Sequence, residues 1–174
     1  MNDLPVPHPV FKNLIEQAQR HAPLKVAVVH PCDATSLESV VSAKEARLID
    51  PILVGPEAKI RNMAQNAKID LSGLPIEPTA HSHAAAARAV ELVREGRVQA
   101  MMKGSLHTDE LMSAIVDHQK GLRTERRISH CFVMATRGHH HPLIVTDAAI
   151  NIAPTLSEKA DIVQNAIDLA HAIG

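Results

Sequence analysis

Aromatic side chains are almost missing from this 174-residue sequence, which contains two Phe and neither Tyr nor Trp. Proteins that bind single-stranded nucleic acid stack bases on such rings, so this function is disfavoured. An excess of charge of one sign is missing as well, because 18 Lys and Arg nearly balance 19 Asp and Glu. The charge balance therefore indicates neither a nucleic-acid partner nor a membrane-surface partner.

Cysteines and long apolar runs are also scarce. Cys32 and Cys131 are far apart and fit no metal-ligand spacing, so we interpret them as buried or free cytosolic thiols. No apolar stretch approaches the roughly 18 residues that span a bilayer. The N-terminus, MNDLPVPHPVFK, lacks the basic and apolar regions of a secretory signal. We expect a soluble, cytoplasmic protein whose core is built from Ala, Val, Ile, Leu and Met.

Helix-like and strand-like segments alternate along almost the whole sequence. Two capping-box signatures, Thr35 with Glu38 and Thr155 with Glu158, are predicted to open helices. The alternation predicts an α/β fold with a largely parallel sheet and flanking helices. The expected strands cover residues 25–30, 51–54, 75–78, 98–102, 129–135 and 142–146, and the expected helices cover 11–21, 57–67, 81–95, 108–118 and the segments after the two capping boxes.

The stretch KGSLHTDE has several properties of an anion-binding loop. In open parallel sheets, ligands bind outside the carboxyl ends of the strands, and this stretch follows the expected strand 98–102. Gly104 would let the backbone approach a ligand, Lys103 supplies charge, and the next helix offers free N–H groups. Ser105 and Thr108 add hydroxyls. A plain strand-to-helix turn with Thr108 as the N-cap explains the stretch equally well, and the spacing of a Walker P-loop is absent.

The stretch RTERRISH places four candidate cations near the entry of an expected strand, namely Arg123, Arg126, Arg127 and His130. Arginine can bind phosphate through two parallel hydrogen bonds, which lysine cannot do with the same geometry. A solvated charged turn is the alternative interpretation for the group as a whole. Arg127 is the strongest candidate because it lies immediately before the apolar run.

Two histidine-rich stretches favour structural roles. The side chains of three adjacent histidines in RGHHHP diverge and cannot converge on one ion, so we expect no metal site there. We interpret this stretch as the loop of a hairpin that joins strand 129–135 to strand 142–146. His81 and His83 precede an Ala-rich helix and are interpreted as residues of its cap.

The most specific stretch of the sequence is TDAAINIAP, an apolar loop that carries one carboxylate, Asp147, and one amide, Asn151. With KGSLHTDELMSAIV, RRISHCFVM and DPILVGP, it resembles the phosphate acetyl/butyryltransferase family. The resemblance extends over nearly the whole chain. It is greatest to the phosphotransacetylase-like part of bifunctional enoyl-CoA hydratase/phosphate acetyltransferases.

This resemblance implies a fold like that of isocitrate and isopropylmalate dehydrogenases, with two α/β domains and a cleft between them. It also implies reversible transfer of an acetyl or short acyl group between coenzyme A and phosphate. Coenzyme A would be a substrate, and neither a cofactor nor a metal is expected for the chemical step. The implied partners are CoA or acyl-CoA and phosphate or acyl phosphate, with homo-oligomerisation of the complete protein and with neither nucleic acid nor a membrane.

The resemblance also assigns site residues. Arg127 matches a phosphate-binding arginine of the family, and Asp147 and Asn151 match a loop at the cleft, where they would organise the site rather than transfer protons. A second set would bind substrate, and within it Lys103 fits the butyryl-like and bifunctional branch. The members of this second set are Lys103, Gly104, Ser105, His107 and Thr108.

One departure from the family pattern is large, because no S-R-A-D-S-like motif occurs in these 174 residues. We therefore interpret residues 1–174 as the N-terminal half of the family domain and the fold as incomplete. The alternative function is an inactive fragment, or a CoA- or phosphate-binding subunit that needs a complementary chain with the distal Ser, Arg and Asp. On either interpretation the chain alone is expected to be inactive. A 4-phosphohydroxythreonine-type dehydrogenase relative is disfavoured by the TDAAINIAP match.

Overall fold

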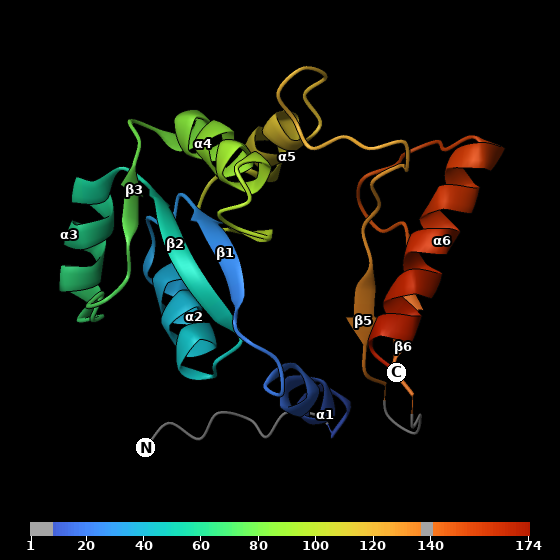
Figure 1. Cartoon of the computed structure of the whole chain (residues 1–174), viewed down its shortest axis with the longest axis horizontal. Coiled ribbons are helices and arrows are strands. Elements are labelled where there is room, and N and C mark those ends of the chain that lie inside the picture. The colour runs from blue at the N-terminus through green and yellow to red at the C-terminus, as the bar shows by residue number, and fades with distance from the viewer. Residues whose placement is uncertain (1–8, 137–140) are drawn as a thin grey trace. The chain divides into compact units, whose positions relative to one another are not determined.

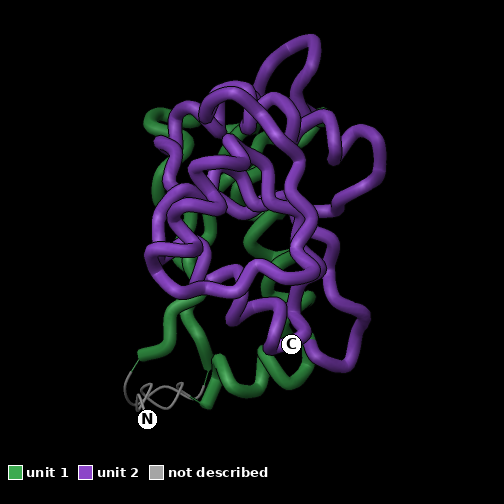
Figure 2. The backbone as a smooth tube through the Cα atoms, turned by 90° about the vertical axis from the view of Figure 1, so that its left-hand side faces the viewer, with its two compact units in different colours: residues 1–18, 124–174 green, residues 19–123 purple. Residues whose placement is uncertain are grey.

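A computed structural model of the chain describes residues 9–136 and 141–174, which form two compact units (Figures 1 and 2). Unit 1 combines the segment that ends at Ala18 with residues 124–174, and unit 2 comprises Gln19–Arg123. Residues 137–140, the first four of the stretch RGHHHP that was predicted as a hairpin loop, lie outside the described residues.

Unit 2 is built on a four-stranded parallel sheet in the order β3-β2-β1-β4. This confirms the predicted α/β architecture. Its strands are β1 (Leu24–Val29), β2 (Ile49–Gly55), β3 (Ile76–Pro78) and β4 (Ala100–Lys103). Its helices are α2 (Ala34–Glu45), α3 (Glu57–Ala67), α4 (Ser82–Arg94) and α5 (Thr108–Ile115).

Strand β1 is buried on both faces of this sheet because successive side chains point in opposite directions. Val26 and Val28 pack with Leu37 of α2 and Ile60 of α3. The alternate residues, Ala27 and Val29, pack on the other face with the Ala-rich side of α4 and with α5. Small alanines on α4 allow that helix to lie close to the sheet. This explains how a core almost without aromatic residues is closely packed.

The direction in which successive strands are added to the sheet reverses at β1. From β1 the chain passes outward through β2 to β3 and then returns to place β4 on the opposite side of β1. Such a switch point separates the two loops that leave the carboxyl ends of the neighbouring strands, and ligands bind there in open α/β sheets. Gly104 lies at this position. A Cβ atom on it would come within 2.5 Å of the Val29 carbonyl oxygen, so only glycine fits.

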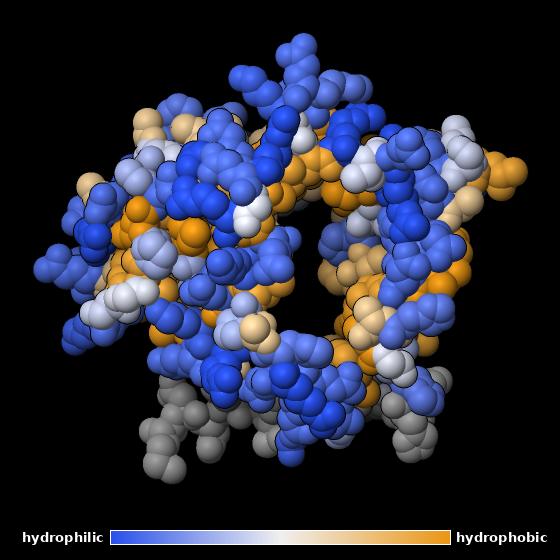
Figure 3. Space-filling view, in the orientation of Figure 1, coloured by the Kyte–Doolittle hydropathy of each residue, from blue (hydrophilic) through white to orange (hydrophobic). Residues whose placement is uncertain are grey.

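Unit 1 contains an antiparallel hairpin, β5 (Phe132–Met134) and β6 (Leu143–Val145), together with α1 (Pro9–Ala18) and α6 (Leu156–Ala172). The predicted hairpin is thereby confirmed. One face of it is apolar and exposed, and hydrophobic surface is visible over this part of the chain in Figure 3. That face carries Phe132, Met134, Leu143 and Val145. No helix in the described part of the chain combines the length and apolarity that a membrane span requires.

One of the two predicted capping boxes is wrong. Helix α2 begins two residues before the position that the Thr35–Glu38 pair indicated, and Asp33 is its N-cap, accepting a 2.7 Å hydrogen bond from the Ser36 amide. A carboxylate at this position accepts both the Ser36 amide and the Ser36 hydroxyl, so it takes the role that Thr35 was expected to have. The second capping box is confirmed, with reciprocal bonds between Thr155 and Glu158.

Gly104→Ala should lower the free energy of unfolding of unit 2 by about 3 kcal/mol, because its methyl group would overlap backbone atoms that cannot move independently. Urea unfolding followed by far-UV circular dichroism measures this loss. Gly96→Asn is the matched control, since Gly96 has a φ of +70° with open space around it, and asparagine tolerates that conformation at a cost of about 1 kcal/mol or less. Equal midpoints for the two variants would contradict the close approach.

Candidate functional site

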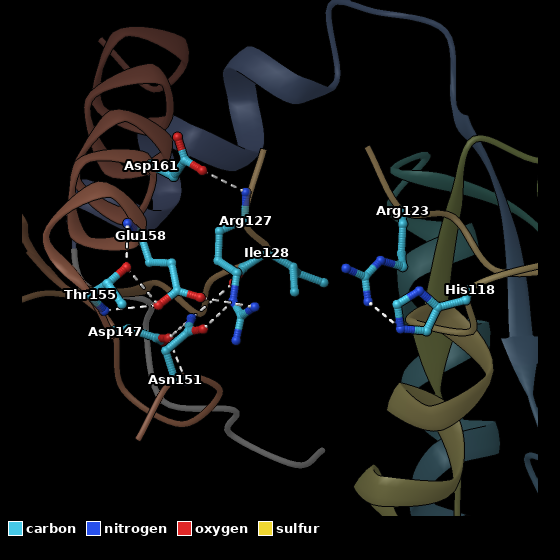
Figure 4. A network of polar contacts seen from close by, with 9 residues as sticks. All are labelled: His118, Arg123, Arg127, Ile128, Asp147, Asn151, Thr155, Glu158 and Asp161. Carbon is cyan, nitrogen blue, oxygen red and sulfur yellow. Dashed lines mark hydrogen bonds and ion pairs between the residues drawn. The ribbon is translucent and has the colours of Figure 1, made fainter. Parts of the chain in front are cut away.

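The Asp147 carboxylate organises the loop that follows β6. Its Oδ1 atom accepts hydrogen bonds from the backbone amides of His130 (3.0 Å), Ala149 and Ile150 (both 3.3 Å). Its Oδ2 atom accepts the Asn151 amide at 2.8 Å and also the Asn151 side chain. One side chain therefore fixes the turn 147–151 and joins it to the segment before β5, as Figure 4 shows in part.

Asn151 connects this ordered turn to Arg127. Its side-chain N–H donates to the Ile128 carbonyl at 2.9 Å, while its Oδ1 accepts the Arg127 Nε–H at 2.7 Å (Figure 4). Arg127 also forms a 3.1 Å ion pair with Glu158 through Nη1. Its side chain is 45% exposed. A guanidinium has five N–H donors, and the described residues take only those on Nε and Nη1, so Arg127 is oriented by the protein and has donors left for a ligand.

Polar residues along one face of α6, here called the polar stripe, hold residues 126–129, here called the arginine segment. Asp161 accepts the Arg127 amide at 2.9 Å, and Asn165 donates to the Arg127 carbonyl at 2.9 Å and to the Ser129 hydroxyl at 2.8 Å. Asp168 pairs with Arg126. None of these three helix residues was predicted as part of the site. The signal was present, because Glu158, Asp161, Asn165 and Asp168 follow one another at spacings that place them on one face of a helix.

These contacts set the ionisation of the acidic groups. Burial by itself raises the pKa of Asp147, but the hydrogen bonds from Asn151, His130 and Ala149 together outweigh burial and lower that pKa to about 2. The pKa of Glu158 is lowered first by the Thr155 amide and hydroxyl and less by the Arg127 charge. Both groups are therefore carboxylates at neutral pH. Asp147 is an acceptor within the loop and not a proton donor.

The predicted substrate-binding loop lies in unit 2, at the carboxyl end of β4. Lys103 Nζ folds back onto its own loop and donates to the carbonyls of Leu106 (2.8 Å) and Gly104 (3.2 Å). The Ser105 hydroxyl donates to the His30 carbonyl at 2.8 Å and accepts the Cys32 amide at 3.2 Å. His107 is the N-cap of α5 without a side-chain capping bond, so Thr108 is the first helical residue and not the cap.

His30 lies in the loop at the carboxyl end of β1, a position typical of ligand loops, but no site role was predicted for it. It follows β1 with a φ of 54°, and its Nδ1 atom lies 3.2 Å from the Ser105 hydroxyl. Burial lowers the pKa of His30, the Lys59 charge lowers it further, and Glu110 opposes the shift. The only sequence signal was its place at the end of a buried strand. Positive φ at a residue other than glycine could not be read from the sequence.

The predicted site residues therefore fall into two groups. In unit 1 the structure brings together Arg127, Asp147 and Asn151, and in unit 2 it places Lys103, Gly104, Ser105, His107 and Thr108 along one loop. Arg123, another candidate, contacts His118 at 3.3 Å within unit 2. In residues 9–136 and 141–174, no cluster of three or more potential metal ligands occurs.

A cavity of about 310 Å³ in unit 1 does not coincide with the predicted residues. It is lined mainly by α1, by the start of β6 and by the end of α6, including Leu14, Ile144 and Ile173. The polar network around Arg127 lies at the surface instead. The candidate site of unit 1 is thus defined by oriented polar groups and not by an enclosed pocket.

Residues 79–174 match the sequence model of the family described as "Phosphate acetyl/butaryl transferase", and they include every predicted site residue. This chain belongs to that family. Among curated relatives, the phosphate acetyltransferase of Rhizobium meliloti is 57% identical over 164 residues, which cover 94% of this chain and 52% of that protein. The phosphate butyryltransferase of Clostridium acetobutylicum is 36% identical over 164 residues, covering 94% of this chain and 54% of that protein.

A solved structure supports the fold independently. A phosphotransacetylase from Streptococcus pyogenes superposes with a TM-score of 0.79 at 19% identity, covering 94% of this chain and 58% of that one. At this identity the likeness concerns the fold alone. The chain spans about half the length of the curated relatives it matches.

Asp147→Asn should lower the stability of unit 1 by about 1 to 2 kcal/mol at pH 7, since an amide N–H₂ would face donors at a partly solvated position. The folded pKa of about 2 lies below the ordinary value of 3.8. The stabilisation is therefore fully present above pH 3.8 and is lost as the pH falls through about 2. Hydrogen exchange of the His130 and Asn151 amides measures the loss.

Asp168→Asn is the control for this prediction, because it removes an exposed ion pair with Arg126 from the same unit. We expect it to change exchange of those two amides little. If Asp147→Asn left both amides as protected as in the parent chain at pH 7, the Asp147 carboxylate would not be the organiser of this loop.

Proposed function

We propose that this chain supplies part of the active site of a phosphate acetyltransferase, which transfers an acetyl group reversibly between coenzyme A and phosphate. The single observation that carries the proposal is the oriented guanidinium of Arg127, fixed by Asn151 and Glu158 and retaining free N–H donors. Family membership supplies the reaction class.

The proposed chemistry places the phosphate group on Arg127. In the direction of acyl-CoA synthesis, the CoA thiolate attacks the carbonyl carbon of acetyl phosphate, a C–S bond forms, and the C–O bond to phosphate breaks. The leaving phosphate gains negative charge during this step. A guanidinium that is already oriented stabilises that charge without reorganising, which is the main advantage of a fixed donor.

Asp147 and Asn151 act in this proposal by positioning. Their hydrogen bonds are made within the protein, and they connect the 147–151 turn to the backbone at Ile128 and His130. The Glu158 carboxylate offsets part of the charge on Arg127. A partly neutralised guanidinium releases phosphate more readily than an unpaired one, which suits a reversible reaction.

We propose acetyl as the transferred group. Support comes from the degree of similarity, because acetyltransferase-named relatives from Rhizobium meliloti and Rickettsia felis are 57% and 53% identical, whereas the butyryltransferase-named relative from Clostridium acetobutylicum is 36% identical. Lys103, which favoured the butyryl-like or bifunctional branch in the sequence, has its ammonium turned toward its own loop carbonyls. This contact does not distinguish acyl-chain lengths.

A hybrid enzyme tests the function. The matched segment of the Rhizobium meliloti phosphate acetyltransferase is replaced by the corresponding 164 residues of this chain, and thiol consumption is measured with acetyl phosphate and CoA. We expect turnover within about tenfold of the parent enzyme. A folded hybrid with the parent's oligomeric state but no turnover would overturn the proposal.

Arg127→Lys in the hybrid should lower kcat/KM by about 100-fold, since lysine keeps the charge but loses the fixed geometry. Arg126→Lys is the matched control, because Arg126 is the adjacent arginine and pairs with Asp168 at an exposed position. We expect the control to change kcat/KM by less than about threefold. Equal effects of the two substitutions would mean that Arg127 does not bind the phosphate group.

A further inference from the structure

The Ser105 hydroxyl determines where His30 carries its proton. A serine hydroxyl has one hydrogen and two acceptor lone pairs. Its hydrogen points to the His30 carbonyl at 2.8 Å, and one lone pair receives the Cys32 amide at 3.2 Å. The remaining lone pair faces His30 Nδ1 at 3.2 Å, so Nδ1 must be the donor. In a neutral ring the proton is then on Nδ1, and Nε2 carries a free lone pair.

The surroundings keep this ring neutral near pH 7. Burial lowers the pKa of His30, and the Lys59 ammonium on α3 lowers it further, whereas Glu110 on α5 opposes them. The other ionisable groups of the two adjoining loops are Cys32, Asp33, Lys103 and His107. Within the described part of the chain, no hydrogen bond is made to Nε2. His30 therefore presents an acceptor beside the β1–β4 switch point.

The rest of this region does not favour a phosphate group. The Lys103 ammonium is directed at two carbonyls of its own loop. The first turn of α5 carries Asp109 and Glu110, whose negative charges offset the positive end of the helix dipole and would repel a bound anion. Phosphate oxygens would also meet the Nε2 lone pair as one acceptor facing another. A neutral ligand group with an N–H, O–H or S–H donor matches this arrangement better than an anion does.

We propose that His30 Nε2 accepts a hydrogen bond from the pantetheine arm of coenzyme A, and that Ser105 is the positioning residue that fixes the required His30 tautomer. The pantetheine arm carries two amide N–H groups, a hydroxyl and a thiol, all of them neutral donors. The identity of this ligand rests on the proposed acetyltransferase function. The tautomer of His30 rests only on the contacts of Ser105.

Long-range ¹H–¹⁵N NMR of the imidazole rings tests the tautomer on the whole 174-residue chain. We expect His30 to be protonated on Nδ1. His81 is an internal control with the opposite tautomer. Its Nδ1 accepts the Ala84 amide at 3.2 Å, so the proton of the neutral ring must lie on Nε2. His30→Asn and His81→Asn assign the two signals, and asparagine suits the positive φ of residue 30. A His30 ring protonated on Nε2 would overturn the inference.

Titration with two separate probes tests the ligand. Pantetheine should shift the His30 Nε2 resonance in the direction of hydrogen bonding, and inorganic phosphate at equal concentration should leave it unchanged. Ser105→Ala should mix the two tautomers and weaken the pantetheine response at least threefold. Circular dichroism and the unchanged His81 signal verify that this variant is folded. A shift with phosphate but none with pantetheine would overturn the proposal.

The hybrid enzyme separates this inference from the proposed function. A hybrid that turns over normally while pantetheine leaves His30 unaffected would contradict the role of His30 alone. A pantetheine response of His30 in a chain whose hybrid is inactive would support the binding role while contradicting the acetyltransferase function.

Discussion

The burial of β1 on both faces is the constraint on which unit 2 depends. Val26, Ala27, Val28 and Val29 are each at most 4% exposed, so two layers of helix must cover the sheet. Small residues on α4 and the bare backbone of Gly104 allow this close packing. Both loops next to the switch point then start from strand ends that cannot shift. The precise placement of His30 and Ser105 is thus a consequence of core packing.

Unit 1 reaches a defined geometry by a different route. Ile162, 5% exposed, is its one buried large apolar side chain among the residues that the structure describes, so hydrophobic packing contributes less there than in unit 2. The order comes from polar contacts, chiefly the donors that converge on Asp147 and the side chains of α6 that hold the arginine segment. Such a network is specific because each of these contacts joins a particular donor to a particular acceptor.

Much of the fold could be predicted from the sequence, since buried strands and amphipathic helices have distinct periodicities. The parallel sheet, the hairpin and the Thr155–Glu158 cap followed from such local patterns. The Thr35–Glu38 cap failed because Asp33, two residues earlier, accepts the Ser36 amide and begins the helix at Ala34, so Thr35 already lies inside the helix. The contacts of Asn151 with Arg127 and of Ser105 with His30 join residues 24 and 75 positions apart, and no local pattern encodes such pairs.

The polar stripe of α6 has a consequence for how the chain can change in evolution. Each residue inserted into a helix rotates everything beyond it by about 100° and advances it by about 1.5 Å. A single insertion between Glu158 and Asp161 would turn Asp161, Asn165 and Asp168 away from the arginine segment together, although every side chain would remain present. Within this span, substitutions can be compensated one at a time, whereas a change of length cannot. The spacing of the polar residues along α6 therefore constrains this helix more than the identity of any one of them.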